Sequence, residues 1–77
     1  MKSKTYDPEV DAFYISRKEG NVAKTLDKGK YLVDYDAKGD ILGYEILNYS
    51  ANAEQLGAID GILLPHPREA AALEVKI

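Results

Sequence analysis

The 77-residue sequence contains no cysteine, which excludes disulfides and thiolate metal sites as means of stabilising so short a chain. Its one histidine, His66, has no second imidazole with which to form a zinc site. No apolar run approaches the roughly 20 residues that cross a membrane, so no membrane association is expected. The basic N-terminus lacks the apolar stretch of a secretory signal, and together with the missing cysteines this predicts a cytoplasmic protein.

Charge of a single sign is also lacking. Ten basic and thirteen acidic residues are interspersed along the chain and give a net charge of −3. Such a chain has no broad basic surface to attract phosphate backbones, so nucleic acid is not an expected partner. The glycines form neither a dinucleotide-binding motif nor a Walker motif, and we therefore expect no nucleotide and no other cofactor.

The short length of the chain predicts one domain with a small core. A domain of this size buries only about 60–65% of the surface that its unfolded chain exposes. The sequence offers neither a disulfide nor an evident metal site as a further constraint, so oligomerisation is the remaining means of stabilisation. Without an internal repeat or a linker, residues 1–77 are predicted to form a single domain that self-associates.

Short apolar runs separated by turn-forming residues predict a β-rich protein. Rich in Tyr, Val, Ile, Leu and Thr, these runs predict antiparallel strands at residues 13–16, 22–26, 31–35 and 41–47. A four-stranded meander sheet is expected, followed by a short helix from Ser50 to Leu56 that ends at Gly57. Ser50 and Asn52 are its candidate N-caps, and Asn52 has the capping-box spacing to Gln55. The predicted fold class is α+β.

The C-terminal segment fits more than one structure. Residues 59–64 are apolar and suit either a strand or an extended arm, and Pro65 and Pro67 must interrupt whatever precedes them. Pro67 suits the first position of a helix running to Leu73, although the alternating apolar residues near the C-terminus also permit a strand. A tail of this kind is often docked on a partner.

The turn between the third and fourth predicted strands is the clearest local signal. Gly39 can adopt the left-handed conformation that this hairpin loop requires. Asp36 suits the first position of the turn because its carboxylate can accept hydrogen bonds from backbone N–H groups. Asp36 and Asp40 are therefore expected to close the loop.

Simple alternation from this turn predicts a sheet with two apolar faces. One face would carry Tyr31, Val33, Tyr35, Ile41, Gly43, Glu45 and Leu47, and the other Leu32, Asp34, Leu42, Tyr44 and Ile46. One short helix cannot cover both faces, so a second chain is expected to cover one of them. The predicted interface residues come from the sheet and from the apolar arm after it: Tyr31, Leu32, Tyr44, Ile46, Ile62 and Leu63.

Several motifs resemble those of a known family. They are Tyr6-Asp7-Pro8-Glu9 with Asp11-Ala12-Phe13-Tyr14-Ile15, Lys24-Thr25, Val33-Asp34-Tyr35-Asp36, and Gly43-Tyr44-Glu45-Ile46-Leu47. In these the sequence resembles the small prokaryotic family known as domain of unknown function 2283. The resemblance implies a β-rich core over about residues 4–50 with a C-terminal extension over about 51–77, and it supplies no substrate, cofactor or catalytic residue. Members look like companions of small toxin-like genes, which implies a protein partner.

Asp7, Glu9 and Asp11 form an alternating acidic cluster that suggests a site for Ca²⁺ or Mg²⁺. However, Pro8 interrupts the cluster, and Ala12 stands where a calcium-binding loop needs glycine. The favoured interpretation is that Asp7 caps a turn and Asp11 holds the backbone amides that follow it. No metal site is therefore predicted.

Asp34 and Glu45 are the other carboxylates available for catalysis, because acids within apolar strands can have raised pKa values. The register above projects them to opposite faces, so they cannot act on one bond unless a bulge reverses one of them. We favour local hydrogen bonding, of Asp34 with Tyr44 or Lys24 and of Glu45 with a tyrosine or a partner chain. No catalytic residue is predicted, and the protein is not expected to be an enzyme.

Six tyrosines offer aromatic surfaces whose use depends on their surroundings. Tyrosines that stack nucleic-acid bases need a basic groove, whereas tyrosine is also enriched at protein interfaces. The sequence therefore predicts a non-catalytic protein-interaction module that forms a homodimer or binds a small protein. A domain that binds a small ligand or a divalent cation is the alternative.

Overall fold

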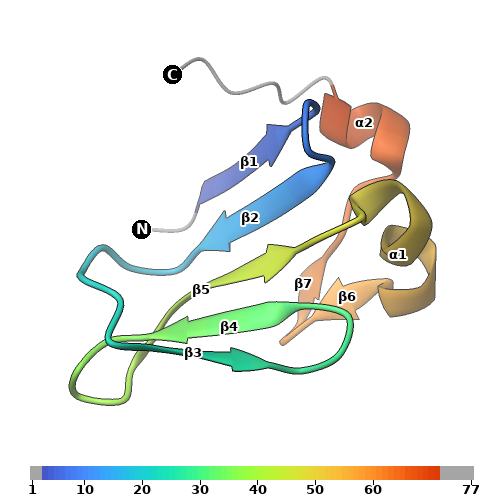
Figure 1. The fold of residues 1–77 in the computed structure, drawn as a ribbon. Coiled ribbons are helices and arrows are strands. Elements are labelled where there is room, and N and C mark those ends of the chain that lie inside the picture. The colour runs from blue at the N-terminus through green and yellow to red at the C-terminus, as the bar shows by residue number, and fades with distance from the viewer. Residues whose placement is uncertain (1–2, 72–77) are drawn as a thin grey trace.

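The computed structural model describes residues 3–71 of the chain. Within that range the chain forms a five-stranded antiparallel sheet, a two-stranded hairpin and two short helices (Figure 1). The sheet consists of β1 (Ser3–Asp7), β2 (Ala12–Ser16), β3 (Lys24–Asp27), β4 (Leu32–Tyr35) and β5 (Ile41–Ile46). Helix α1 (Tyr49–Leu56), strands β6 (Ala58–Ile59) and β7 (Ile62–Leu63), and helix α2 (Pro67–Ala71) follow.

The strand order β1-β2-β5-β4-β3 places β5, the last of these five strands along the chain, at the centre of the sheet. β5 pairs with β2 on one side and with β4 on the other, and it thereby joins the β1–β2 and β3–β4 hairpins. The expected four-stranded meander is wrong in two respects, because the sheet has five strands and because β2 and β3 are not neighbours. β1 escaped prediction because Ser3 and Lys4 are exposed and Tyr6 is its one buried residue.

The β4–β5 turn forms as predicted, but the strands beyond it do not keep the predicted register. Gly39 has φ +92°, and the Asp36 carboxylate accepts the Lys38 and Asp40 amides, both at 2.9 Å. A bulge then shifts the register: Tyr35 lies opposite Ile41, whereas Asp34 lies opposite Gly43. The extra residue, Leu42, is buried beside Gly20.

The bulge gathers the large apolar side chains of the sheet on one face. Tyr44 and Ile46 now share a face with Phe13, Ile15 and Val33, their cross-strand neighbours. The helices and the β6–β7 hairpin contribute Tyr49, Ala53, Ile59 and Ala70 to the same core cluster. The opposite face carries Tyr14, Leu32, Asp34, Gly43 and Glu45. Neither a helix nor the β6–β7 hairpin covers it in Figure 1. The prediction of two apolar faces is therefore wrong.

Helix α1 is attached to the β1–β2 turn by Asp11. The helix begins one residue before the predicted start, and its N-cap, Asn48, is left-handed and makes no side-chain capping bond. Instead the Asp11 carboxylate accepts hydrogen bonds from the Ser50 amide at 3.0 Å and from its hydroxyl at 3.0 Å. Asn52 lies inside the helix rather than at a cap, and the helix ends before Gly57 as predicted.

The segment after α1 forms the hairpin β6–β7 and then helix α2, which has Pro67 at its first position as predicted. His66 caps this helix, because its Nδ1 accepts the Arg68 amide and its own N–H donates to the Glu69 carboxylate. The predicted continuation to Leu73 lies outside the described residues. Between residues 3 and 71, neither helix is long and apolar enough to cross a membrane.

Candidate functional site

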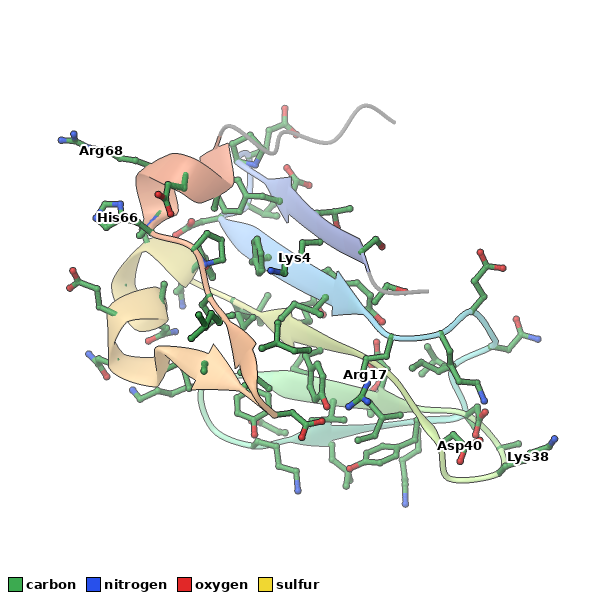
Figure 2. The ribbon with its side chains drawn as sticks, turned by 180° about the vertical axis from the view of Figure 1, so that it is seen from behind. Lys4, Arg17, Lys38, Asp40, His66 and Arg68 are labelled. Carbon is green, nitrogen blue, oxygen red and sulfur yellow. The ribbon has the colours of Figure 1, made fainter. Side chains whose placement is uncertain are left out.

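A groove of about 270 Å³ lies over β4 on the core side of the sheet. Strands β6 and β7 have only two residues each, so this hairpin leaves part of the sheet face near β3 uncovered. Figure 2 shows the hairpin in front of the sheet, on the side where the groove opens. The lining is mainly aromatic and aliphatic: Tyr31, Val33, Tyr35, Ile41, Tyr44 and Ile59, with Lys28 and Asp60 as the charged members.

The hairpin wall of the groove is held in place by a polar cluster around Asp60. This residue occupies the β6–β7 turn with φ 52°, and its carboxylate accepts a hydrogen bond from the Tyr44 hydroxyl at 2.6 Å. The guanidinium of Arg17, labelled in Figure 2, also donates to the Asp60 carboxylate and to the Tyr44 hydroxyl. Burial and the Asp60 carboxylate raise the pKa of Tyr44, which keeps its hydroxyl protonated as the donor.

The groove also borders β3, an edge strand of the sheet, because Lys28 in its lining directly follows that strand. The four residues of β3 are all exposed, and Leu26 retains 38% of its accessible surface. Lys24, Leu26 and Lys28 alternate along the chain and therefore lie on the groove side of the sheet. The Lys24 ammonium lies 5.7 Å from the centre of the Tyr35 ring, a cation–π distance.

The backbone of β3 has hydrogen-bonding groups that no strand among residues 3–71 uses. The Lys28 N–H donates to the carbonyl of Tyr31, the residue before β4. Hydrogen-bonded pairs alternate along an antiparallel ladder, so the N–H and C=O groups of Thr25 and Asp27 point away from β4. An open edge of this kind can pair with another extended segment.

In the cluster of Asp7, Glu9 and Asp11, the Asp7 and Asp11 carboxylates make separate hydrogen bonds within the fold. Asp7 accepts the Glu9 amide at 3.0 Å, and Asp11 accepts the Tyr6 hydroxyl at 2.5 Å in addition to its bonds to α1. The Asp11 carboxylate therefore accepts the Ser50 amide of a distant helix rather than the amides that follow Asp11. In the described part of the chain, no three Asp, Glu or His side chains converge as a metal site would require.

The bulge also brings Asp34 and Glu45 to the same face, contrary to the predicted register. Both flank Tyr14 on the uncovered face, and the Tyr14 hydroxyl lies 3.2 Å from the Asp34 carboxylate. The second Asp34 oxygen accepts the Thr25 hydroxyl at 2.7 Å, so its hydrogen-bond partners are Tyr14 and Thr25 rather than Tyr44 or Lys24. Gly43 gives the Tyr14 ring room, because a Cβ at residue 43 would collide with it.

The raised pKa values of Tyr14 and Tyr49 predict that the protein loses stability at alkaline pH. Burial raises the pKa of the Tyr14 and Tyr49 hydroxyls, in both cases to about 12. The nearby Asp34 carboxylate adds to this effect at Tyr14, and other neighbouring groups add to it at Tyr49. Because these folded-state values exceed the unfolded value, their stabilisation is complete below about pH 10 and is lost as the pH rises towards about 12. Urea unfolding across this range should show falling stability, and Tyr14→Phe should reduce the slope. A pH-independent midpoint would contradict the prediction.

Comparison with known sequences places the β sheet in a family. A family model described as "protein of unknown function (DUF2283)" matches residues 4–50. The chain belongs to the DUF2283 family. An uncharacterized protein of Methanocaldococcus jannaschii is 42% identical over 45 residues, which are 58% of this chain and 39% of that protein. The chain thus spans less than half the length of that relative, and no solved structure matches it significantly.

The DUF2283 match confirms the resemblance and divides the groove into two parts. Apart from Ser3, strands β1–β5 lie within the matched residues, and β4 and β5 with Lys28 and Tyr31 provide most of the groove lining. Ile59 and Asp60, in the hairpin wall, lie beyond residue 50. The groove is therefore built jointly by the DUF2283 core and the segment that follows it.

The structure separates the predicted interface residues into three groups. Tyr44 and Ile46 are 3% and 0% exposed in the chain's own core, which leaves a partner almost no access to their side chains. Tyr31, Leu32 and Ile62 are half-buried, and Tyr31 lines the groove. Leu63 is 76% exposed on the hairpin. Of the six predicted residues, Tyr31 and Tyr44 line the groove, and Tyr31 is the more exposed of the two.

Sequence reasoning missed the hairpin wall of the groove and the β3 edge beside it. Asp60 had no distinguishing signal, because its role depends on Arg17 and Tyr44, which are distant in sequence. The alternation of Lys24, Leu26 and Lys28 was visible in the sequence. It was not informative until the strand order placed β3 at an edge beside the groove.

Proposed function

We propose that this DUF2283 protein is a non-catalytic interaction module that binds an extended segment of a protein at β3. The observation that supports this most directly is the open β3 edge beside an aromatic groove. Pairing with an edge strand gives affinity through the backbone, and adjacent pockets for alternate side chains give specificity. Here Leu26 and the groove supply the side-chain contacts.

The size and lining of the groove favour protein side chains over a small molecule. Its volume of about 270 Å³ lies below the roughly 300–1,000 Å³ that is usual for small-ligand pockets. Tyrosine is prominent in the lining, and tyrosine is enriched where proteins contact one another. Among residues 3–71, no cluster of Asp, Glu or His side chains supports the alternative of a divalent-cation domain.

Self-association is the second form of this proposal. The argument for it from two apolar sheet faces no longer applies, because the bulge gathers the apolar residues on one face. A homodimer would instead pair two copies of β3 edge to edge. Sedimentation equilibrium over a wide concentration range measures whether such a dimer forms.

Replacing Thr25 with proline is expected to abolish partner binding while leaving the fold intact. Proline removes the N–H that points away from β4, and edge strands tolerate proline in that orientation. It also removes the Thr25 hydroxyl that binds Asp34, so Thr25→Val is the matched control because it loses only that hydroxyl. Proteins recovered from native lysate are quantified by mass spectrometry. Compared with the wild-type chain, their amount should fall at least about tenfold for Thr25→Pro but not for Thr25→Val.

Two results would contradict the proposed function. One is recovery of the same proteins by Thr25→Pro and by the wild-type chain, which would show that the β3 edge is not used. The other is the absence of any recovered protein together with a wild-type chain that remains monomeric at all concentrations. Circular dichroism of both variants establishes that lost binding does not reflect lost folding.

A further inference from the structure

The β3 edge carries a concentration of positive charge that the rest of the chain does not neutralise. Residues 22–31 contain three lysines and one aspartate, although the whole chain has a net charge of −3. Among residues 3–71 the ion pairs involve Arg17 and Lys18, and none involves Lys24, Lys28 or Lys30. The Asp27 carboxylate accepts the Gly29 amide at 2.8 Å.

The order of residues along the groove side of β3 is cation, aliphatic, cation. Lys24 and Lys28 flank Leu26 at alternate positions, with Val33 of β4 directly opposite Leu26. An added antiparallel strand would place its own alternate side chains opposite these three residues. Cross-strand neighbours stabilise the pairing of two strands when they carry opposite charges or are both apolar. Neighbours of like charge destabilise the pairing.

We infer that the occupant of the β3 edge is an extended segment of another protein in which an acidic residue, an aliphatic residue and an acidic residue stand at alternate positions. This inference rests on the proposed function and adds the chemistry of the partner. The two carboxylates pair with Lys24 and Lys28. The aliphatic side chain packs on Leu26, at the margin of the groove whose floor includes Val33 and Tyr35.

A second copy of the chain fits this edge less well. Antiparallel pairing of two β3 strands that brings Leu26 against its counterpart also brings Lys24 of one copy against Lys28 of the other. Two such lysine pairs would form, one on each side of the paired leucines, and both would be repulsive. The charge pattern therefore favours an acidic partner over self-pairing.

Synthetic peptides test the inference directly on the full chain. The probe is a fluorescein-labelled peptide in which glutamate, isoleucine and glutamate alternate with threonine, and binding is followed by fluorescence anisotropy. One control peptide has lysines in place of the glutamates, and a second has the same composition with the alternation scrambled. We expect the glutamate peptide to bind at least about fivefold more tightly than either control and to weaken as salt is raised.

Charge reversal on the protein supplies the matched variants. Lys28→Glu should weaken binding of the glutamate peptide about fivefold, and the double variant Lys24→Glu/Lys28→Glu should prefer the lysine peptide. Lys38→Glu makes the same change of net charge at the β4–β5 turn, and it should leave binding unchanged within about twofold (Figure 2). Equal effects of Lys28→Glu and Lys38→Glu would overturn the inference.

The remaining outcomes separate the inference from the proposed function. If the glutamate peptide fails to bind while Thr25→Pro still abolishes capture of a native protein, the β3 edge is used and the partner chemistry is wrong. If the wild-type chain forms a dimer that Thr25→Pro dissociates, a second copy is the occupant and the inference fails. If neither the peptide nor any native protein depends on the edge, both fail.

Discussion

Replacing Gly43 with alanine is expected to lower the free energy of unfolding by about 3 kcal/mol. A Cβ at this position would lie 2.6 Å from the Ile15 carbonyl oxygen and closer still to the Tyr14 hydroxyl. Gly43 is at the centre of the sheet, where β2 and β4 pair on either side of β5. The Ile15 backbone cannot move aside without disturbing that pairing, so the strain falls on the central ladder.

Gly39→Ala is the matched control for this prediction. Gly39 has open space around it, and its φ of +92° is the only obstacle to a side chain. Its replacement should therefore cost about 1 kcal/mol, the usual penalty for a non-glycine residue with a left-handed backbone. Urea denaturation of both variants measures the difference, and equal losses of stability would refute the close approach of Tyr14 and Ile15 to Gly43.

The second large effect is expected for Asp11→Ala, which should also lower the free energy of unfolding by about 3 kcal/mol. The substitution removes the acceptor of the Tyr6 hydroxyl and the cap of helix α1 at Ser50. Tyr6 is 6% exposed, and its part-buried hydroxyl would lose its acceptor. Alanine also tolerates the φ of 54° at this position less well than aspartate does.

Asp7→Ala tests whether that loss is specific to Asp11, because Asp7 belongs to the same acidic cluster but makes one exposed turn bond. Its replacement should change stability by no more than about 0.5 kcal/mol. Burial alone would raise the pKa of Asp11, but hydrogen bonds from Tyr6 and Ser50 outweigh burial and hold it below the ordinary value of 3.8. The stabilisation by Asp11 is therefore present above that pH and is lost as the pH falls below it. Similar losses for both variants would contradict this role.

Local features of the fold could be predicted from sequence because neighbouring residues determine them. The β4–β5 turn, the end of α1 at Gly57 and the start of α2 at Pro67 each depend on the backbone preferences of one or two residues. The close approach to Gly43 was also predictable, since a glycine inside a strand often marks such a contact. β1 was missed because an exposed edge strand has little apolar alternation to reveal it.

The sheet faces and the groove could not be predicted, because both depend on a single unpaired residue. Leu42 fits an ordinary strand by its sequence, and nothing local marks it as the bulged position. Without the bulge, alternation assigns Tyr44 and Ile46 to the face of Asp34. Both faces of the sheet would then be apolar, and each would need covering. With the bulge, Tyr44 joins the core and reaches Asp60, which completes the hairpin wall of the groove.

The central position of β5 has a consequence for synthesis of the protein on the ribosome. The β1–β2 and β3–β4 hairpins can each form as soon as their own residues emerge, but isolated two-stranded hairpins are marginal in water. They have no pairing with each other and wait for residues 41–46, which bond to both. The nascent chain therefore exposes an unpaired edge on β2 and another on β4 until β5 is made. In a chain truncated before Ile41, no strand would pair the two hairpins.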